Sequence, residues 1–123
     1  MKKYDEAQVA YRSALKEQPL LAGSLLGLGR ALLATGTNTD QGITYIERAI
    51  RIRPQLKEGY YFLGQFFENS DPKKAVRYYR TFKKQAISDP EFAEELANAS
   101  GKLEASAQKN TTGKREINSN TKL

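Results

Sequence analysis

Cysteine, histidine and tryptophan are all absent from this chain of 123 residues. Without cysteine, the chain can form neither a disulfide framework nor a thiolate nucleophile. Without cysteine and histidine, it also lacks the side chains that most transition-metal sites require. These absences exclude many classes of enzyme, and we expect no metal and no cofactor.

Long apolar runs are lacking as well. The most apolar stretch, residues 19–34, is interrupted by Arg30 and is shorter than the about 20 residues that cross a bilayer. Lys2 and Lys3 are followed by a charged helical pattern, whereas a secretory signal would continue with an apolar segment. We therefore expect no transmembrane segment and a cytoplasmic location.

Two residue sets recur along the chain at a fixed spacing. In the first set, small residues flank a large one ahead of a proline. It occurs as Ala7, Tyr11, Ala14 and Pro19, as Gly42, Ile46, Ala49 and Pro54, and in weakened form as Ala75, Tyr79, Phe82 and Ile87. The second set, Leu25, Leu28, Gly29 and Leu32, returns after 35 residues as Tyr60, Leu63, Gly64 and Phe67. A fixed period of this size is typical of stacked helical hairpins, in which the glycine of one helix leaves space for the large residue of another.

These residues resemble the tetratricopeptide repeat family, in which Trp-x-x-Leu-Gly-x-x-Tyr, Ala-x-x-x-Phe-x-x-Ala and Pro follow one another over about 34 residues. The resemblance covers roughly residues 4–105. Tyr60 and Leu25 stand in place of the tryptophan, Gly42 in place of an alanine, and Ile87 in place of the proline. The resemblance implies an all-α fold: a right-handed superhelical stack of antiparallel helix hairpins, with about two and a half repeats and a C-terminal capping helix. It also implies a protein-interaction scaffold and not an enzyme.

The pattern divides the chain into five parts. We expect the second helix of an incomplete repeat in residues 1–19, repeats in 20–55 and 56–89, a capping helix in 90–107 and a disordered basic tail in 108–123. The helices should span about 3–17, 22–35, 40–52, 56–69, 72–87 and 90–107. Asp71 before Pro72 and Asp89 before Pro90 are the strongest start signals, because each places a capping carboxylate ahead of a proline suited to the first helical position. The tail is polar and has few apolar residues to bury.

The first helix lacks the packing partner that a complete repeat would supply. Residues 4–19 match only the second half of the repeat pattern. Two interpretations are open: the chain is a piece of a longer repeat array, or another subunit or a partner helix covers the apolar side of this helix. The second interpretation includes self-association through the N-terminal helix.

The resemblance also implies where a protein or peptide partner would bind. In this family the first helices of successive hairpins line a concave surface, along which ligand peptides lie. The matching positions form our candidate site: Leu26, Arg30, Leu33, Tyr61, Gln65 and Glu68. Other inner positions, including Glu58, Glu94 and Asn98, make this surface apolar at one end and acidic at the other. We expect Tyr61 to act as an anchor, so that its truncation weakens binding and leaves thermal stability almost unchanged.

Leu26 and Leu33 allow two interpretations. The helix over residues 22–35 is apolar on nearly all sides, so both stay apolar after the core positions have been assigned. They either pack against a neighbouring helix or form a pocket for an apolar peptide anchor beside Arg30. A subset of the family holds acidic peptide C-termini with several cations, whereas the corresponding positions here provide only Arg30. We therefore expect no such clamp.

A basic segment occupies residues 73–84. Its six cations, with no acid among them, are Lys73, Lys74, Arg77, Arg80, Lys83 and Lys84. Cations between aromatic side chains can bind nucleic acid, but Tyr79 and Phe82 already belong to the repeat pattern and are not free to stack on bases. The segment is either a solvated convex face or a surface for an anionic partner, reinforced by the basic tail. An acidic protein, a nucleic acid and a membrane surface are the candidates, and the last two are less favoured than the first.

Catalysis has little support. Glu94 and Glu95 point about 100° apart on a helix, so they do not form an acid and base pair facing one substrate. Two functions are left. The favoured one is a scaffold that holds a peptide or helix of a partner protein in the concave groove, as part of a larger protein or assembly. The alternative is a binder of an anionic partner through residues 73–84 and the tail.

Overall fold

The computed structural model describes the backbone of residues 2–121 and the side chains of residues 3–109. In this part of the chain there is no strand, and the helices are α1 (Lys2–Glu17), α2 (Ala22–Thr35), α3 (Thr39–Ile52), α4 (Lys57–Phe67), α5 (Pro72–Ala86), the short 3₁₀ helix η1 (Pro90–Phe92) and α6 (Ala93–Thr121). The predicted all-α fold is confirmed. From α1 to α5, the helix ends lie within two residues of the expected positions.

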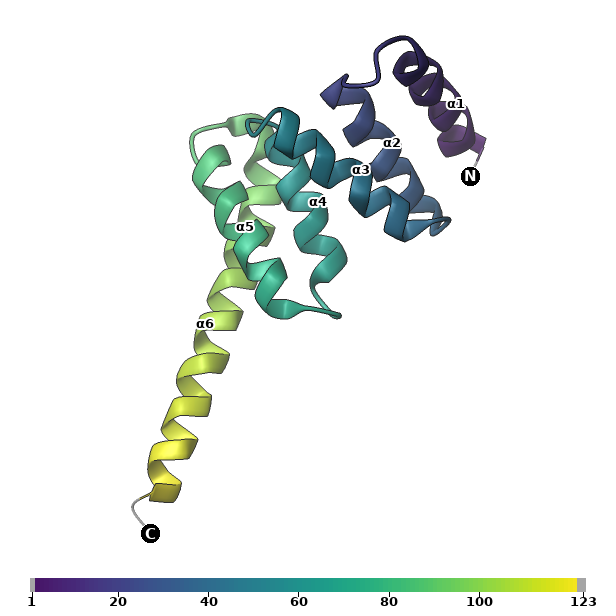
Figure 1. Cartoon of the computed structure of the whole chain (residues 1–123). Helices are drawn as coiled ribbons and strands as arrows, with labels where there is room; N and C mark the ends of the chain where they lie inside the picture. The colour runs from purple at the N-terminus through teal and green to yellow at the C-terminus, as the bar shows by residue number, and fades with distance from the viewer. Residues whose placement is uncertain (1, 122–123) are drawn as a thin grey trace.

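Neighbouring helices pack as hairpins (Figure 1). The two most extensively packed pairs are α2 with α3 and α4 with α5, which are the two hairpins that the repeat pattern predicts. α1 packs against α2, α3 against α4, and α6 against α5. Beyond the last hairpin, α6 continues away from the body of the molecule as a single long helix (Figure 1).

Glycine lies at the closest approach within each hairpin. A Cβ atom on Gly29 would lie 2.6 Å from Cγ1 of Ile46 and 2.7 Å from the backbone oxygen of Gly42. In the next hairpin, a Cβ atom on Gly64 would lie 2.7 Å from Cε1 of Tyr79. Real Cβ atoms almost never come this close to another atom, because protein interiors are already close-packed. The structure thus confirms that the large residue of one set enters the space left by the glycine of the other.

The core consists of two clusters of buried side chains. The first joins α2, α3 and α4 and contains Leu25, Leu26, Ile43, Ile46, Ala49 and Leu63. The second joins α4, α5 and α6 and contains Tyr61, Ala75, Tyr79, Phe82, Ala86 and Ala99. Phe92, Leu96 and Leu103 pack partly buried against the second cluster. The beginning of α6 therefore closes the end of the stack, as expected of a capping helix.

Within the described residues, other helices cover only one side of α1. It packs against α2 through Tyr11, whose ring lies close to Gly27. A Cβ atom placed on Gly27 would lie only 2.3 Å from Cζ of Tyr11. None of the described α1 side chains is fully buried, and Val9 is 70% exposed. One side of α1 is thus left exposed by the residues that the structure describes, and both the missing partner and self-association through α1 stay predictions.

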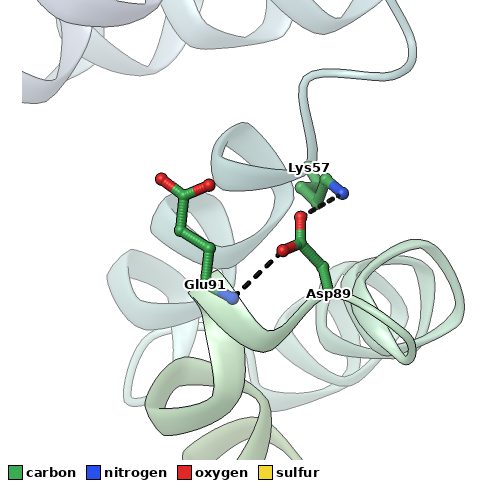
Figure 2. Close-up of polar contacts among 3 residues, drawn as sticks. All are labelled: Lys57, Asp89 and Glu91. Atoms are coloured by element: carbon green, nitrogen blue, oxygen red, sulfur yellow. Dashed lines mark hydrogen bonds and ion pairs between the residues drawn. The ribbon is translucent and has the colours of Figure 1, made fainter.

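Aspartate caps both of the helix starts that the sequence marks most strongly. Asp71 Oδ1 accepts a hydrogen bond from the backbone N–H of Lys74 at 3.2 Å, and Asp89 Oδ1 accepts one from the N–H of Glu91 at 3.1 Å. Asp89 Oδ2 also forms an ion pair of 2.9 Å with Lys57 Nζ (Figure 2). Because Lys57 begins α4, this ion pair fastens the start of the cap to the preceding hairpin.

The ion pair with Lys57 makes folding stability depend on pH in the acid range. The hydrogen bond from Lys57, followed by the N–H of Glu91, lowers the pKa of Asp89 below its usual value. A carboxyl whose pKa is lower in the folded state stabilises the fold above its unfolded pKa of about 3.9, and this contribution is lost as the pH falls through the folded pKa. Asp89→Asn should therefore be less stable than the natural protein at pH 5, and the difference should shrink toward pH 2. Urea unfolding across this range measures it, and a difference independent of pH would contradict the assignment.

The C-terminal part of the chain differs from the prediction. Residues 108–121 were expected in a disordered tail, but α6 continues to Thr121. No proline follows Pro90, and once a helix has started, each added residue gains a backbone hydrogen bond without a new nucleation step. The side chains of the predicted basic tail beyond Lys109 lie outside the described residues.

Candidate binding groove

Two adjoining hollows lie along the surface formed by α2, α4 and the start of α6. We call the larger one the acidic pocket. It has a volume of about 540 Å³ and is lined by Arg30, Glu58, Tyr61, Phe62, Gln65, Phe82, Phe92, Glu94, Glu95 and Asn98. The smaller one, the apolar pocket, measures about 340 Å³ and is lined by Arg30, Leu33, Ala34, Phe62, Gln65 and Phe66. Three residues belong to both, so the two hollows form one continuous groove.

Aromatic rings form the wall of the acidic pocket. The Tyr61 ring centroid lies 5.0 Å from that of Phe82, and the Phe82 centroid lies 6.0 Å from that of Phe92 in an edge-to-face arrangement. Such pairs add stability beyond the area that they bury. The Tyr61 hydroxyl accepts a hydrogen bond from Asn98 Nδ2 at 2.7 Å. This contact joins α4 to α6 across the pocket, which therefore depends on the capping helix.

The charges of the acidic pocket are unequal. Three carboxylates line it, Glu58, Glu94 and Glu95, against a single cation, Arg30. The Arg30 guanidinium lies over the Phe62 ring at 4.8 Å from the centroid. Within residues 3–109 the two ion pairs are Lys57–Asp89 and Lys102–Glu68, and neither involves these four residues. The Glu95 Oε2 atom is buried and has no hydrogen-bond partner among the described residues.

Four of the six candidate residues lie in the groove. Arg30 and Gln65 are exposed on its surface and line both pockets. Leu33 is half-buried and lines the apolar pocket, whereas Tyr61 lines the acidic pocket but is only 8% exposed. Tyr61 is thus a core residue whose edge reaches the groove, and we therefore expect its truncation to lower stability as well as binding.

Leu26 and Glu68 lie outside the groove. Leu26 is 7% exposed and packs in the first core cluster, where a Cβ atom on Gly59 would lie 3.5 Å from its Cδ1. The packing interpretation therefore holds for Leu26. Glu68 accepts a hydrogen bond from the Tyr79 hydroxyl and forms a 3.5 Å ion pair with Lys102. Burial and this hydrogen bond raise the pKa of Tyr79 above its usual range. Glu68 thus fastens α4 to α5 and α6.

Several groove residues were missed by the sequence reasoning. Phe62 and Phe66 line the apolar pocket, and Phe66 is 37% exposed. The repeat pattern had already assigned Tyr60, Leu63 and Phe67 to the core, so these two phenylalanines were left over in the same way as Leu33. This surplus of apolar residues beyond the core positions was the feature of the sequence that could have indicated an apolar pocket. Phe92 and Glu95 come from the cap. Its sequence does not follow the repeat pattern, so its groove positions could not be assigned by comparison with the other repeats.

The basic segment forms a stripe on the outer side of α5. Its most exposed cations, which we call the basic stripe, are Lys73, Arg77, Arg80 and Lys84. Their spacing of four, three and four residues places them on one helical face. Lys74 instead lies over the Phe67 ring at 4.4 Å, and Lys83 is half-buried. Tyr79 and Phe82 are buried, as expected, and do not face a ligand on this side.

The described residues contain no group of histidine, cysteine, aspartate and glutamate side chains that could hold a metal ion. None of the helices, as far as the chain is described, is long and apolar enough to cross a membrane.

Comparison with known proteins identifies the fold. No family model matches the sequence, and no curated protein does either. Among the solved structures, three of the type III secretion translocator chaperone SycD of Yersinia enterocolitica are similar to this chain. One structure of SycD has a TM-score of 0.77 at 19% sequence identity, and the match covers 89% of this chain and 76% of that chain. A second structure, of SycD in complex with a peptide of the translocator YopD, has the same TM-score and identity, and the match covers 89% of this chain and 83% of that chain. A third, an alternative dimer, has a TM-score of 0.76 at 20% identity. The chain therefore has the same helical-repeat fold as this chaperone.

Proposed function

We propose that this chain is a scaffold of the tetratricopeptide repeat type that holds a segment of a partner protein in the groove. The observation that carries this proposal is the pair of adjoining pockets, of about 540 and 340 Å³, along α2, α4 and α6. Concave sites with apolar walls and a few polar groups are typical of ligand binding. The structure of SycD in complex with a YopD peptide supports the proposal, because it shows that a chain of this fold can bind a peptide.

The groove offers two kinds of contact to such a segment. The apolar pocket, between Leu33 and Phe66, suits an aliphatic or aromatic anchor. The exposed amide of Gln65 and the guanidinium of Arg30 can donate hydrogen bonds to the backbone carbonyls of an extended segment. This division gives affinity through the anchor and orientation through the polar groups. We propose a role without catalysis, and the cytoplasmic location stays a prediction.

A selection from a random peptide library tests the proposed function. Peptides of about twelve residues are displayed and selected on the immobilised full chain, and the tightest binder is synthesised. Gln65→Trp should weaken the binding of this peptide by about tenfold or more, since the indole fills the junction of the two pockets. Fluorescence anisotropy measures the affinity. The matched control is Gln108→Trp, which changes another exposed glutamine, on α6 outside the groove.

Equal affinity of the peptide for Gln65→Trp and for the natural protein would contradict the proposal. A loss shared by both tryptophan variants would do so as well, because it would not come from the groove. Circular dichroism verifies that both variants keep the helical fold.

The basic stripe supports a second candidate function, the binding of an anionic partner. Its exposed side chains form none of the ion pairs found among residues 3–109. If the groove is the binding surface, the double variant Arg77→Ala and Lys84→Ala should change the affinity of the selected peptide by less than about twofold at physiological salt. If the stripe binds, the double variant should abolish binding, and the natural protein should lose affinity steeply between low and physiological salt.

A further inference from the structure

The acidic pocket has a chemistry of its own that the proposed function does not use. Its three carboxylates come from two sides, Glu58 from α4 and Glu94 and Glu95 from α6. The rings of Tyr61, Phe62, Phe82 and Phe92 line the same pocket. A cavity lined by both carboxylates and aromatic rings matches a group that is positive at one end and apolar along its length.

We infer that the acidic pocket takes a lysine or arginine side chain of the bound segment. The inference rests on the proposed function, because it assigns a side chain to one of the two pockets of the groove. The aliphatic stem of lysine or arginine packs well on apolar surface while its charged end reaches polar groups. The neighbouring apolar pocket would then take the apolar anchor of the same segment.

The buried oxygen of Glu95 is the first argument for a cation. Oε2 is removed from solvent and has no donor among the described residues. A buried acceptor without a partner destabilises the unliganded state, and a charged donor compensates more than a neutral one. Because this oxygen is removed from solvent, the Glu95 side chain has to rotate toward the pocket before an entering guanidinium or ammonium group can donate a hydrogen bond to it.

The aromatic wall is the second argument. Cations are attracted to the faces of aromatic rings within about 6 Å of the centroid. Arg30 already makes this contact with Phe62, at 4.8 Å, at the junction of the two pockets. The rings also exclude water from the wall of the pocket, and a charge pair beside them is less screened than in bulk solvent.

The same charges disfavour an acidic side chain. One cation faces three carboxylates in the lining, so an anion in this pocket meets net repulsion. Arg30 also lines the apolar pocket, where it is able to contact the backbone of the segment. The charge of the pocket therefore selects a basic residue over a neutral one, and a neutral one over an acidic one.

Capped tripeptides test this order directly by nuclear magnetic resonance. The probes are acetyl-Leu-Gly-Arg-amide, the same peptide with citrulline, which has the shape of arginine without its charge, and the same peptide with glutamate. Titration into the labelled full chain should shift the resonances of Gln65, Glu94 and the Asn98 side-chain amide. We expect the arginine probe to bind about fivefold more tightly than the citrulline probe, and the glutamate probe to bind most weakly.

Two glutamate-to-glutamine variants distinguish the effect of the pocket on probe affinity from the effect of the overall charge of the protein. Glu95→Gln keeps the shape of the side chain and should bring the affinity of the arginine probe close to that of the citrulline probe. Glu104→Gln removes the same charge from an exposed position of α6 outside the pocket, and it should leave the preference for arginine unchanged.

Equal affinities of the arginine and citrulline probes would overturn the inference while leaving the groove as a binding surface. A preference for arginine that Glu95→Gln and Glu104→Gln reduce equally would overturn it too, because general attraction would then explain the result. If no probe shifts the groove resonances, the inference is wrong. If the peptide selected from the library does not shift them either, the proposed function fails with it.

Discussion

Tyr61→Ala should lower the free energy of unfolding by about 3–5 kcal/mol, the range for deleting a large buried aromatic side chain. Tyr61 is only 8% exposed, and its ring contacts Tyr79 and Phe82 on α5 at centroid distances of 5.9 and 5.0 Å. Its removal leaves a void where α4, α5 and α6 meet. Because the same ring lines the acidic pocket, peptide binding should weaken together with stability. Urea unfolding followed by circular dichroism measures the change.

Tyr61→Phe provides the matched control. It keeps the ring and removes only the hydroxyl that accepts the hydrogen bond from Asn98. Asn98 is exposed, so its amide can bond to water instead, and the destabilisation should stay within about 1 kcal/mol. A similar small loss for Tyr61→Ala would show that the ring is not packed in the core, and would restore its interpretation as a free anchor.

Gly29→Ala should destabilise the protein by about 1–3 kcal/mol, although alanine is the better helix former. The added methyl group would lie 2.7 Å from the backbone oxygen of Gly42 and 2.6 Å from the buried side chain of Ile46. A backbone atom cannot rotate away as a side chain can, so α2 and α3 have to move apart. Thermal or urea unfolding measures the loss.

Gly23→Ala is the control on the same helix. Apart from its chain neighbours and the backbone of its own helix, no atom lies within 4 Å of a Cβ placed on Gly23, so only the gain in helix propensity is left. This variant should be more stable than the natural protein by up to about 1 kcal/mol. The two substitutions should therefore have opposite signs, and a stabilising effect of Gly29→Ala would contradict the close approach of α2 and α3.

The hairpins could be predicted because the repeat fixes the same contact twice. Gly29 with Ile46 and Gly64 with Tyr79 are equivalent pairs, and each pairs a glycine of one set with the large residue of the other. A contact that recurs at a fixed spacing can be predicted from a single sequence, because every repeat packs against its neighbours in the same way. The capped starts at Asp71 and Asp89 were likewise local, because each cap depends on neighbouring residues only.

The groove could be predicted only in part. α2 is apolar on nearly all sides, so its sequence pattern does not distinguish core positions from groove positions. In the structure, Leu26 packs toward α4 and Leu33 lines the groove. Tyr61 was expected to be free because its sequence neighbours do not show that Asn98 of α6 reaches its hydroxyl. Contacts between segments 37 residues apart depend on how the cap docks, and the cap departs from the repeat.

The most direct measurement of the central claim is to map where the library-selected peptide binds. Backbone amide resonances of the labelled full chain are recorded with and without the peptide. If the groove is the binding surface, the largest shifts should occur at Arg30, Gln65 and Asn98, which line the two pockets. The largest shifts at Arg77, Arg80 and Lys84 would contradict the account, because the peptide would then lie on the basic stripe of α5 and not in the groove.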